Sequence, residues 1–186
     1  MTHEVPDAFV LRNYHCDAST SVARYLTHAF FVSEFGHFRI DYNDPQFLDV
    51  NPYRSRSGAW WNAVEAKVHS VPHVIAIVSP ELATVRPDTD TGVGLLTELL
   101  GFWERPKAPF GSPEKLLPIL VDCSLDDLVV PRGGYEQLQD IVVPLLRRLR
   151  PIYFESTALV HDLPATLNFV NSVATRLNLT RLAPGC

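Results

Sequence analysis

One stretch near the middle of the chain constrains the fold more than any other, because it joins a helical pattern directly to a buried strand. Apolar residues recur there at helical spacing, with Trp61, Val64 and Val68 on one face. Pro72 then prevents the helix from continuing. Residues 74–78 follow as an unbroken apolar run, which is typical of a strand covered on both faces. A helix that leads straight into such a strand is half of an α/β unit.

The rest of the chain alternates between strand and helix signals. Further strands are predicted at residues 8–11, 38–41, 116–121 and 152–154, and further helices at residues 19–32, 93–103, 140–150 and 164–177. Pro118 indicates a bulge or an edge position in its strand, and Pro144 interrupts its helix. Right-handed crossovers place helices on both faces of a parallel sheet. The sequence therefore predicts an α/β fold, a flavodoxin-like three-layer sandwich with a five-stranded parallel sheet.

Length and composition favour one compact domain over residues 1–186. The chain has 186 residues, 46% hydrophobic and 20% charged, which suffices for a core without disulfides or metal. No apolar stretch approaches the length of a membrane span, so the sequence predicts a protein that does not enter the membrane.

Charge and cysteine content bear on partners and location. The formal net charge of −5 argues against a nucleic-acid partner and favours small molecules or proteins. The three cysteines are scattered without a CxxC pair, and the N-terminus lacks a basic start and an apolar signal core. Both observations predict a reduced, cytoplasmic protein.

In an open α/β sheet, ligands bind at the carboxyl ends of the strands, where the strand order reverses. For a flavodoxin-like order, that switch point lies between the first and third strands. The residues that the sequence delivers there, or just off the second strand, are Arg12, Asn13, Tyr14, Tyr42, Asn43 and Ser79. No metal site is predicted: His69 and His73 have the spacing of a metal-binding pair, but Pro72 breaks the helix between them, so they do not share a face, and the sequence offers no obvious third ligand.

Several segments, in order along residues 7–178, resemble successive parts of TIR (Toll/interleukin-1 receptor) domains. They are residues 7–10 with Asp17 for the opening strand and loop, 38–44 for the second strand and the start of the BB loop, 60–80 for a Trp-led helix and a strand ending in Ser-Pro, 117–121 for the fourth strand, and 145–154 for the approach to the fifth. The order of these motifs carries the resemblance. The chain departs from the family at Gly94 and Leu95, where TIR domains often have Trp-Cys.

The resemblance implies an enzyme and a catalytic residue. Residues 95–99 lie where the family has a helix with a Glu-Leu pair, and in enzymatic members that glutamate, here Glu98, is catalytic. TIR enzymes cleave the bond between nicotinamide and ribose in NAD, and the cationic pyridinium leaves without a general acid. A carboxylate stabilises the oxocarbenium-like ribose. Arg12 is then assigned to the diphosphate, and Tyr14 and Tyr42 to stacking on rings. NAD is the substrate, and no cofactor is expected.

The resemblance also implies partners and a biological setting. The chain is similar to the TIR proteins of bacterial Thoeris antiphage systems, which make a cyclic or conjugated ADP-ribose signal. Because the chain begins at a Met and leaves no room beyond the domain, we expect a separate effector or sensor protein. Self-association is expected through the long loop at residues 43–59, since TIR domains pack against one another there.

Two other functions fit the same motifs. One is a non-catalytic TIR module that signals by homotypic assembly through the BB loop. The other is a nucleoside deoxyribosyltransferase-like enzyme, which shares the architecture and a catalytic glutamate. Release of nicotinamide from NAD separates both from the NAD-consuming enzyme.

Overall fold

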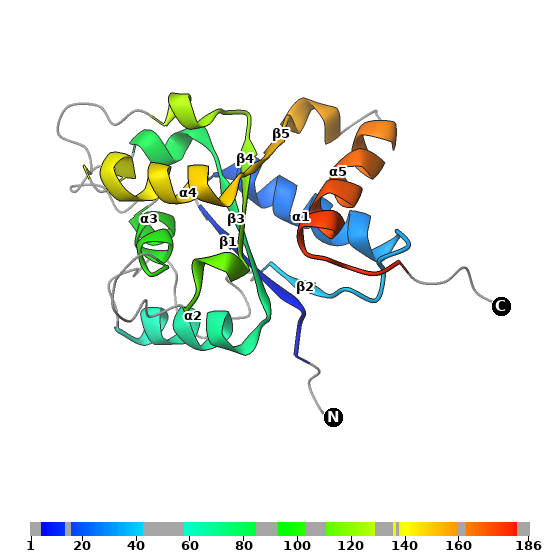
Figure 1. The fold of residues 1–186 in the computed structure, drawn as a ribbon, viewed down its shortest axis with the longest axis horizontal. Coiled ribbons are helices and arrows are strands. Elements are labelled where there is room, and N and C mark those ends of the chain that lie inside the picture. Colours follow the sequence, from blue (N-terminus) through cyan, green and yellow to red (C-terminus); the bar gives the residue numbers. More distant parts are fainter. Residues whose placement is uncertain are drawn as a thin grey trace.

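Five parallel strands form one sheet in the order β2-β1-β3-β4-β5 (Figure 1). The computed structural model of the protein describes residues 5–13, 16–42, 58–84, 93–102, 111–128, 136, 138–159 and 163–181. The strands are β1 (Ala8–Arg12), β2 (Ile40–Asp41), β3 (His73–Val78), β4 (Leu116–Val121) and β5 (Ile152–Phe154). The helices are α1 (Asp17–Phe31), α2 (Gly58–Ser70), α3 (Val93–Leu100), α4 (Val143–Leu149) and α5 (Leu163–Arg176).

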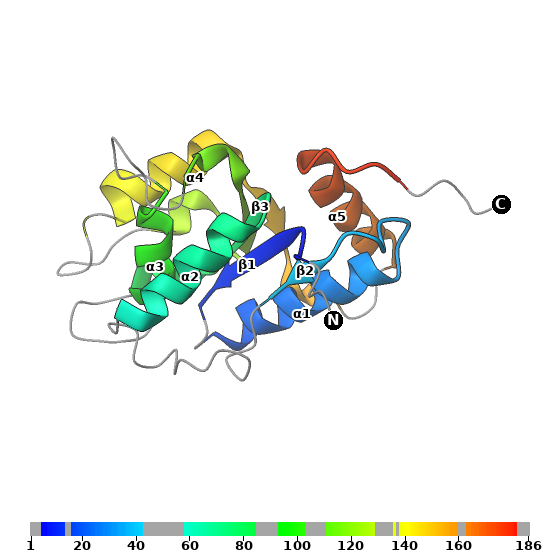
Figure 2. The same ribbon diagram turned by 90° about the horizontal axis from the view of Figure 1, so that it is seen from below.

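Helices cover both faces of the sheet, as Figures 1 and 2 show. Strand β1 explains the layering, because its side chains alternate between two apolar clusters. Phe9 and Leu11 pack with residues of α2, α3 and α4, whereas Ala8 and Val10 pack with residues of α1 and α5. All five residues of β1 are buried. The predicted flavodoxin-like three-layer sandwich with a five-stranded parallel sheet is therefore confirmed.

The element boundaries differ from the predicted ones where a local contact is decisive. Helix α1 begins at Asp17, earlier than predicted, because the Cys16 thiol accepts a hydrogen bond from the Ser19 N–H and caps the helix. Strand β2 begins only at Ile40. The predicted start at Phe38 is wrong because the Phe38 N–H donates to the Phe35 carbonyl in a turn, over 2.8 Å.

Pro118 does not mark a bulge, since the pairing of β4 with β3 runs without interruption through Ala76 and Pro118. The strand as a whole is central, between β3 and β5, and the predicted edge character is confined to the level of Pro118. The pairing of β4 with β5 begins one residue later, at Ile119 and Ile152. At the level of Pro118 the strand therefore has a partner on its β3 side only, so the missing N–H leaves no β5 acceptor unpaired.

Pro144 lies in the first turn of α4, directly after a π-helical turn at Leu138–Val142.

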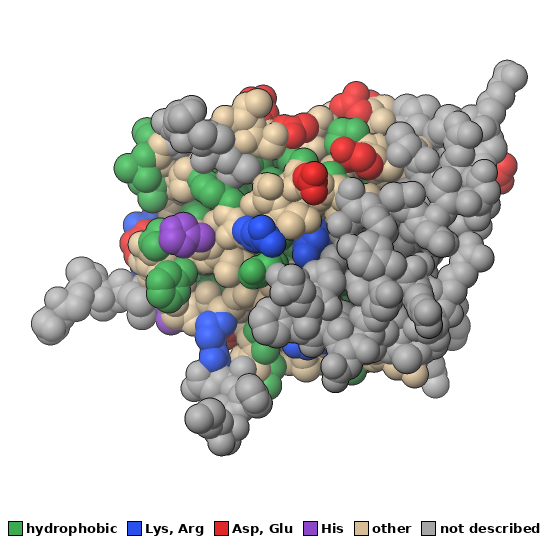
Figure 3. All heavy atoms as spheres, turned by 180° about the vertical axis from the view of Figure 1, so that it is seen from behind, with side chains coloured by type: hydrophobic (Ala, Val, Ile, Leu, Met, Phe, Trp, Pro, Cys, Tyr) green, Lys and Arg blue, Asp and Glu red, His purple; other side chains and the backbone are tan. Residues whose placement is uncertain are grey.

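The surface is mixed in charge on the face turned away in Figure 1. Acidic side chains gather along its upper edge, and basic side chains lie below them (Figure 3). Within the described ranges, no helix combines the length and the apolar character needed to cross a membrane.

Candidate functional site

The carboxyl ends of β1 and β3 lie side by side and form the switch point of the sheet. Arg12 ends β1 and pairs in register with Ile77 of β3. Asn13 follows β1 directly, and Ser79 follows β3. The strand order turns to β2 on one side of β1 and to β3 on the other, which is where ligands bind in open α/β sheets.

Buried polar side chains gather at this point. Among the described residues, the buried polar or charged side chains are Arg12, Asn13, Ser19, Ser79 and Glu98, which are 3%, 5%, 0%, 1% and 1% exposed. Each belongs to the end of β1 or β3, or to a helix that packs there. Burial of polar groups costs free energy unless they are paired, and such groups concentrate at functional sites. Their location therefore indicates where the site lies.

A small hydrogen-bonded network joins the start of α1 to the end of β3. The Ser19 hydroxyl donates to the Ser79 hydroxyl over 3.2 Å, and the Ser79 hydroxyl donates to the Cys16 sulfur over 3.5 Å. The Ser19 N–H reaches the same sulfur over 3.4 Å. These contacts fix the first turn of α1 against the sheet.

Arg12 connects three elements at the site. Its Nη1 donates to the Thr20 Oγ1 on α1 over 2.7 Å, and its Nε donates to the Tyr42 carbonyl oxygen after β2 over 3.4 Å. Next to Tyr42, the Asp41 carboxylate accepts a hydrogen bond from Lys67 of α2 over 2.7 Å. The guanidinium is thus held at a defined place between β1, α1 and the end of β2.

Glu98 brings a carboxyl group into the apolar interior. It lies on α3 with Leu95, Leu96 and Leu99, which are all buried. Its Oε2 is buried and has no hydrogen-bond partner among the residues that the structure describes. Burial raises the pKa of Glu98 well above its ordinary value, and the positive charge of Arg12 acts in the opposite direction. A buried carboxyl oxygen without a hydrogen-bond partner is rare in folded proteins. Binding of a ligand group to this oxygen would explain its presence here.

The structure brings together most of the predicted site residues. Arg12, Asn13 and Ser79 are buried at the switch point, and Tyr42 is half-buried beside them. Arg12 acts on Glu98 through its charge. Tyr14 and Asn43 lie outside the described residues, as does most of the predicted loop at residues 43–59.

Sequence reasoning missed three side chains that support the site, namely Cys16, Ser19 and Thr20. All three lie at the start of α1, one turn or two after Arg12. A run of small polar residues next to a strand end is the signal that was available, but which of them would turn inward depends on tertiary packing.

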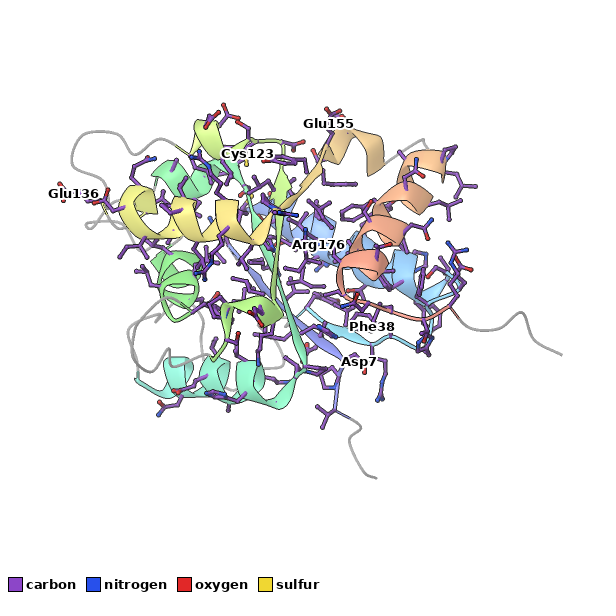
Figure 4. The ribbon with its side chains drawn as sticks, viewed as in Figure 1. Asp7, Phe38, Cys123, Glu136, Glu155 and Arg176 are labelled. Atoms are coloured by element: carbon purple, nitrogen blue, oxygen red, sulfur yellow. The ribbon has the colours of Figure 1, made fainter. Side chains whose placement is uncertain are left out.

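A hollow of about 810 Å³ lies elsewhere, between the carboxyl ends of β4 and β5 and one side of α5. Cys123 and Glu155 line it, and Figure 4 places both near the upper edge of the sheet. A second hollow of about 560 Å³ continues it along α5 to Arg176. None of the five buried polar side chains lines either hollow. We therefore take the switch point as the candidate site, on the chemistry of its side chains.

Metal ligands do not cluster in the described part of the chain, where no group of three or more His, Cys, Asp or Glu residues is placed to hold a metal ion. His69 contacts Glu65 over 3.7 Å on the same helix. His73 packs against the Phe38 ring with a centroid separation of 6.0 Å, and burial lowers its pKa. The described residues at the switch point contribute the Glu98 carboxyl, the Arg12 guanidinium, the Cys16 thiol and several hydroxyl and amide groups.

Compared with known proteins, the chain matches no family model, and no curated protein matches it closely enough to count as a relative.

Proposed function

We propose that the protein is a NAD-consuming enzyme of the TIR type, which cleaves the bond between nicotinamide and ribose. The observation that carries this proposal is the Glu98 carboxyl, which is 1% exposed, has a buried oxygen without a described hydrogen-bond partner, and lies within the field of Arg12. A buried carboxyl oxygen without a described hydrogen-bond partner is available to a group of the substrate. The order of TIR-like motifs along the chain favours NAD as that substrate.

The proposed reaction needs one carboxylate. The bond from the ribose C1′ to the nicotinamide nitrogen breaks, and its electron pair leaves with nicotinamide, which becomes neutral. Positive charge then develops on the ribose, and the Glu98 carboxylate stabilises it. Because the site is buried, this attraction is stronger than it is in water. The positive charge on the nicotinamide ring of the substrate favours the ionised form of Glu98 and so opposes the effect of burial on its pKa.

The remaining residues at the switch point bind the rest of NAD in this proposal. The Arg12 guanidinium takes the diphosphate, for which its charge and planar donors are suited. Tyr42, with Tyr14, stacks on a ring of the substrate. Asn13 and Ser79 line the site, with the Ser79 hydroxyl oriented by its contacts with Ser19 and Cys16.

Purified protein incubated with NAD is expected to release free nicotinamide, which chromatography measures. If nicotinamide is not released, but a deoxyribose is exchanged between nucleobases, the protein is a deoxyribosyltransferase-like enzyme instead. If neither reaction occurs in a folded protein, the non-catalytic interaction module is the better account.

We expect the sugar product to be a cyclic ADP-ribose isomer or an ADP-ribose conjugate. The side chains of Arg12, Asn13, Ser79 and Glu98 are all at most 5% exposed, which favours exclusion of bulk water from the ribosyl cation. A nitrogen or hydroxyl oxygen of the same ADP-ribose, or of a bound acceptor, then attacks C1′ and loses its proton. Mass spectrometry of the reaction identifies the product.

The resemblance to Thoeris proteins supports a role for this product as a signal in antiphage defence, read by a separate effector. Mass spectrometry of cells under phage challenge tests this step. Linear ADP-ribose as the sole product, both there and with pure protein, would identify a NAD-depleting hydrolase and exclude the signalling role.

Activity is expected to depend on self-association. In the TIR family, the loop that corresponds to residues 43–59 packs against a neighbouring domain and helps to complete the site. Turnover per molecule should therefore fall on dilution, as dissociation removes the neighbour. A protein that stays monomeric by light scattering with a NAD analogue present, and keeps constant turnover on dilution, would exclude this assembly.

A further inference from the structure

Thr20 holds the Arg12 side chain through a short hydrogen bond. The hydrogen bond from Arg12 Nη1 to Thr20 Oγ1 is 2.7 Å long, whereas that from Nε to the Tyr42 carbonyl oxygen is 3.4 Å long. The shorter contact is the stronger one. Thr20 is itself fixed, because its N–H donates to the Cys16 carbonyl oxygen over 3.1 Å.

We infer that Thr20 is a positioning residue, whose hydroxyl fixes the place of the Arg12 guanidinium relative to the Glu98 carboxyl. Thr20 does not touch the substrate in this inference and acts through Arg12. Its consequence for catalysis rests on the proposed function, but its consequence for Glu98 does not.

The pKa of Glu98 depends on where the Arg12 guanidinium lies. Burial raises the pKa of Glu98, and Arg12 is the charged group that counteracts it. Helix α3 packs against β1, which carries Arg12, and against the π-helical turn at Leu138–Val142. The titratable residue of that turn, Asp140, is exposed. If the guanidinium moves away, no other described charge on these elements replaces it, and the pKa of Glu98 rises further.

The test compares Thr20→Val, which removes the hydroxyl and keeps the branched shape, with Thr20→Ser, which keeps the hydroxyl. The Glu98 carboxyl carbon is followed by NMR during a pH titration, and its signal is assigned by its loss in Glu98→Gln. We expect Glu98 to titrate at higher pH in Thr20→Val than in the wild-type protein, and Thr20→Ser to restore the wild-type curve. Thr20→Ala provides a second removal of the hydroxyl.

Nicotinamide release gives the catalytic readout. At neutral pH we expect kcat of Thr20→Val to fall by about tenfold, the lower end of the loss found when hydrogen-bond partners that orient metal-binding residues are removed. Because a higher pKa requires a higher pH for ionisation, the acid limb of the rate profile should move to higher pH, and the loss should shrink as pH rises.

The outcomes separate this inference from the proposed function. A folded Thr20→Val protein whose Glu98 titrates as in the wild type overturns the inference, as does a Thr20→Ser protein that behaves like Thr20→Val. A shifted titration in a protein that releases no nicotinamide in any form supports the role of Thr20 and overturns the proposed function.

Discussion

The Glu98→Gln variant is expected to lose nicotinamide release by about a hundredfold to a thousandfold, while it keeps the wild-type fold. The substitution preserves the size of the side chain and removes the negative charge that stabilises the ribosyl cation. Glu98 is 1% exposed and lies on the same helix as the buried Leu95, Leu96 and Leu99, so an uncharged side chain of equal size fits the same space. Circular dichroism establishes the fold, and a single-turnover assay measures the release.

Glu65→Gln is the matched control for this variant. Glu65 is also a helical glutamate, but it lies half-buried on α2 and contacts His69. It should release nicotinamide at the wild-type rate. Equal turnover by folded Glu98→Gln and Glu65→Gln proteins would remove Glu98 from the mechanism.

The Glu98→Leu variant is expected to be more stable than the wild-type protein at neutral pH, by about 1–3 kcal/mol, which is the usual cost of an unpaired buried polar group. Each kcal/mol corresponds to a rise in Tm of about 2–4 °C for a chain of this size. A leucine in place of Glu98 continues the apolar surface of Leu95, Leu96 and Leu99. Arg12 keeps its partners Thr20 and Tyr42.

The pH dependence of the free energy of unfolding explains why Glu98→Leu is expected to be the more stable protein at neutral pH. The folded-state pKa of Glu98 lies well above its ordinary value of 4.5, mainly because of burial. As pH rises above that ordinary value, the unfolded chain releases the proton and the folded chain retains it, so the free energy of unfolding falls until the folded pKa is passed. Thermal melts across pH should show this fall in the wild type and a smaller one in Glu98→Leu. A variant that is less stable at neutral pH would indicate that Glu98 supports the fold.

The sequence predicts those features of the fold and of the site whose signal lies in neighbouring residues. Strands β4 and β5 have the predicted bounds, because each is a short apolar run between turn residues. The start of α1 was misplaced because its capping residue is Cys16, which is not among the preferred N-cap types. The positions of Arg12 and Ser79 at the switch point are predictable because each lies at the end of a strand or directly after one. Ser19 and Thr20 are not predictable in this way, since their roles depend on contacts across the fold.

The two borders of the sheet are both very short. Strand β2 has two residues, and β5 has three, with Pro151 directly before it and Arg150 at a φ of 52° turning the chain out of α4. A border strand exposes backbone N–H and C=O groups to which strands of other molecules can add, and short length and proline limit this. Growth of the sheet from molecule to molecule is therefore disfavoured at either border. Ordered contacts between copies of this protein are therefore expected to use side chains rather than the backbone of these two strands.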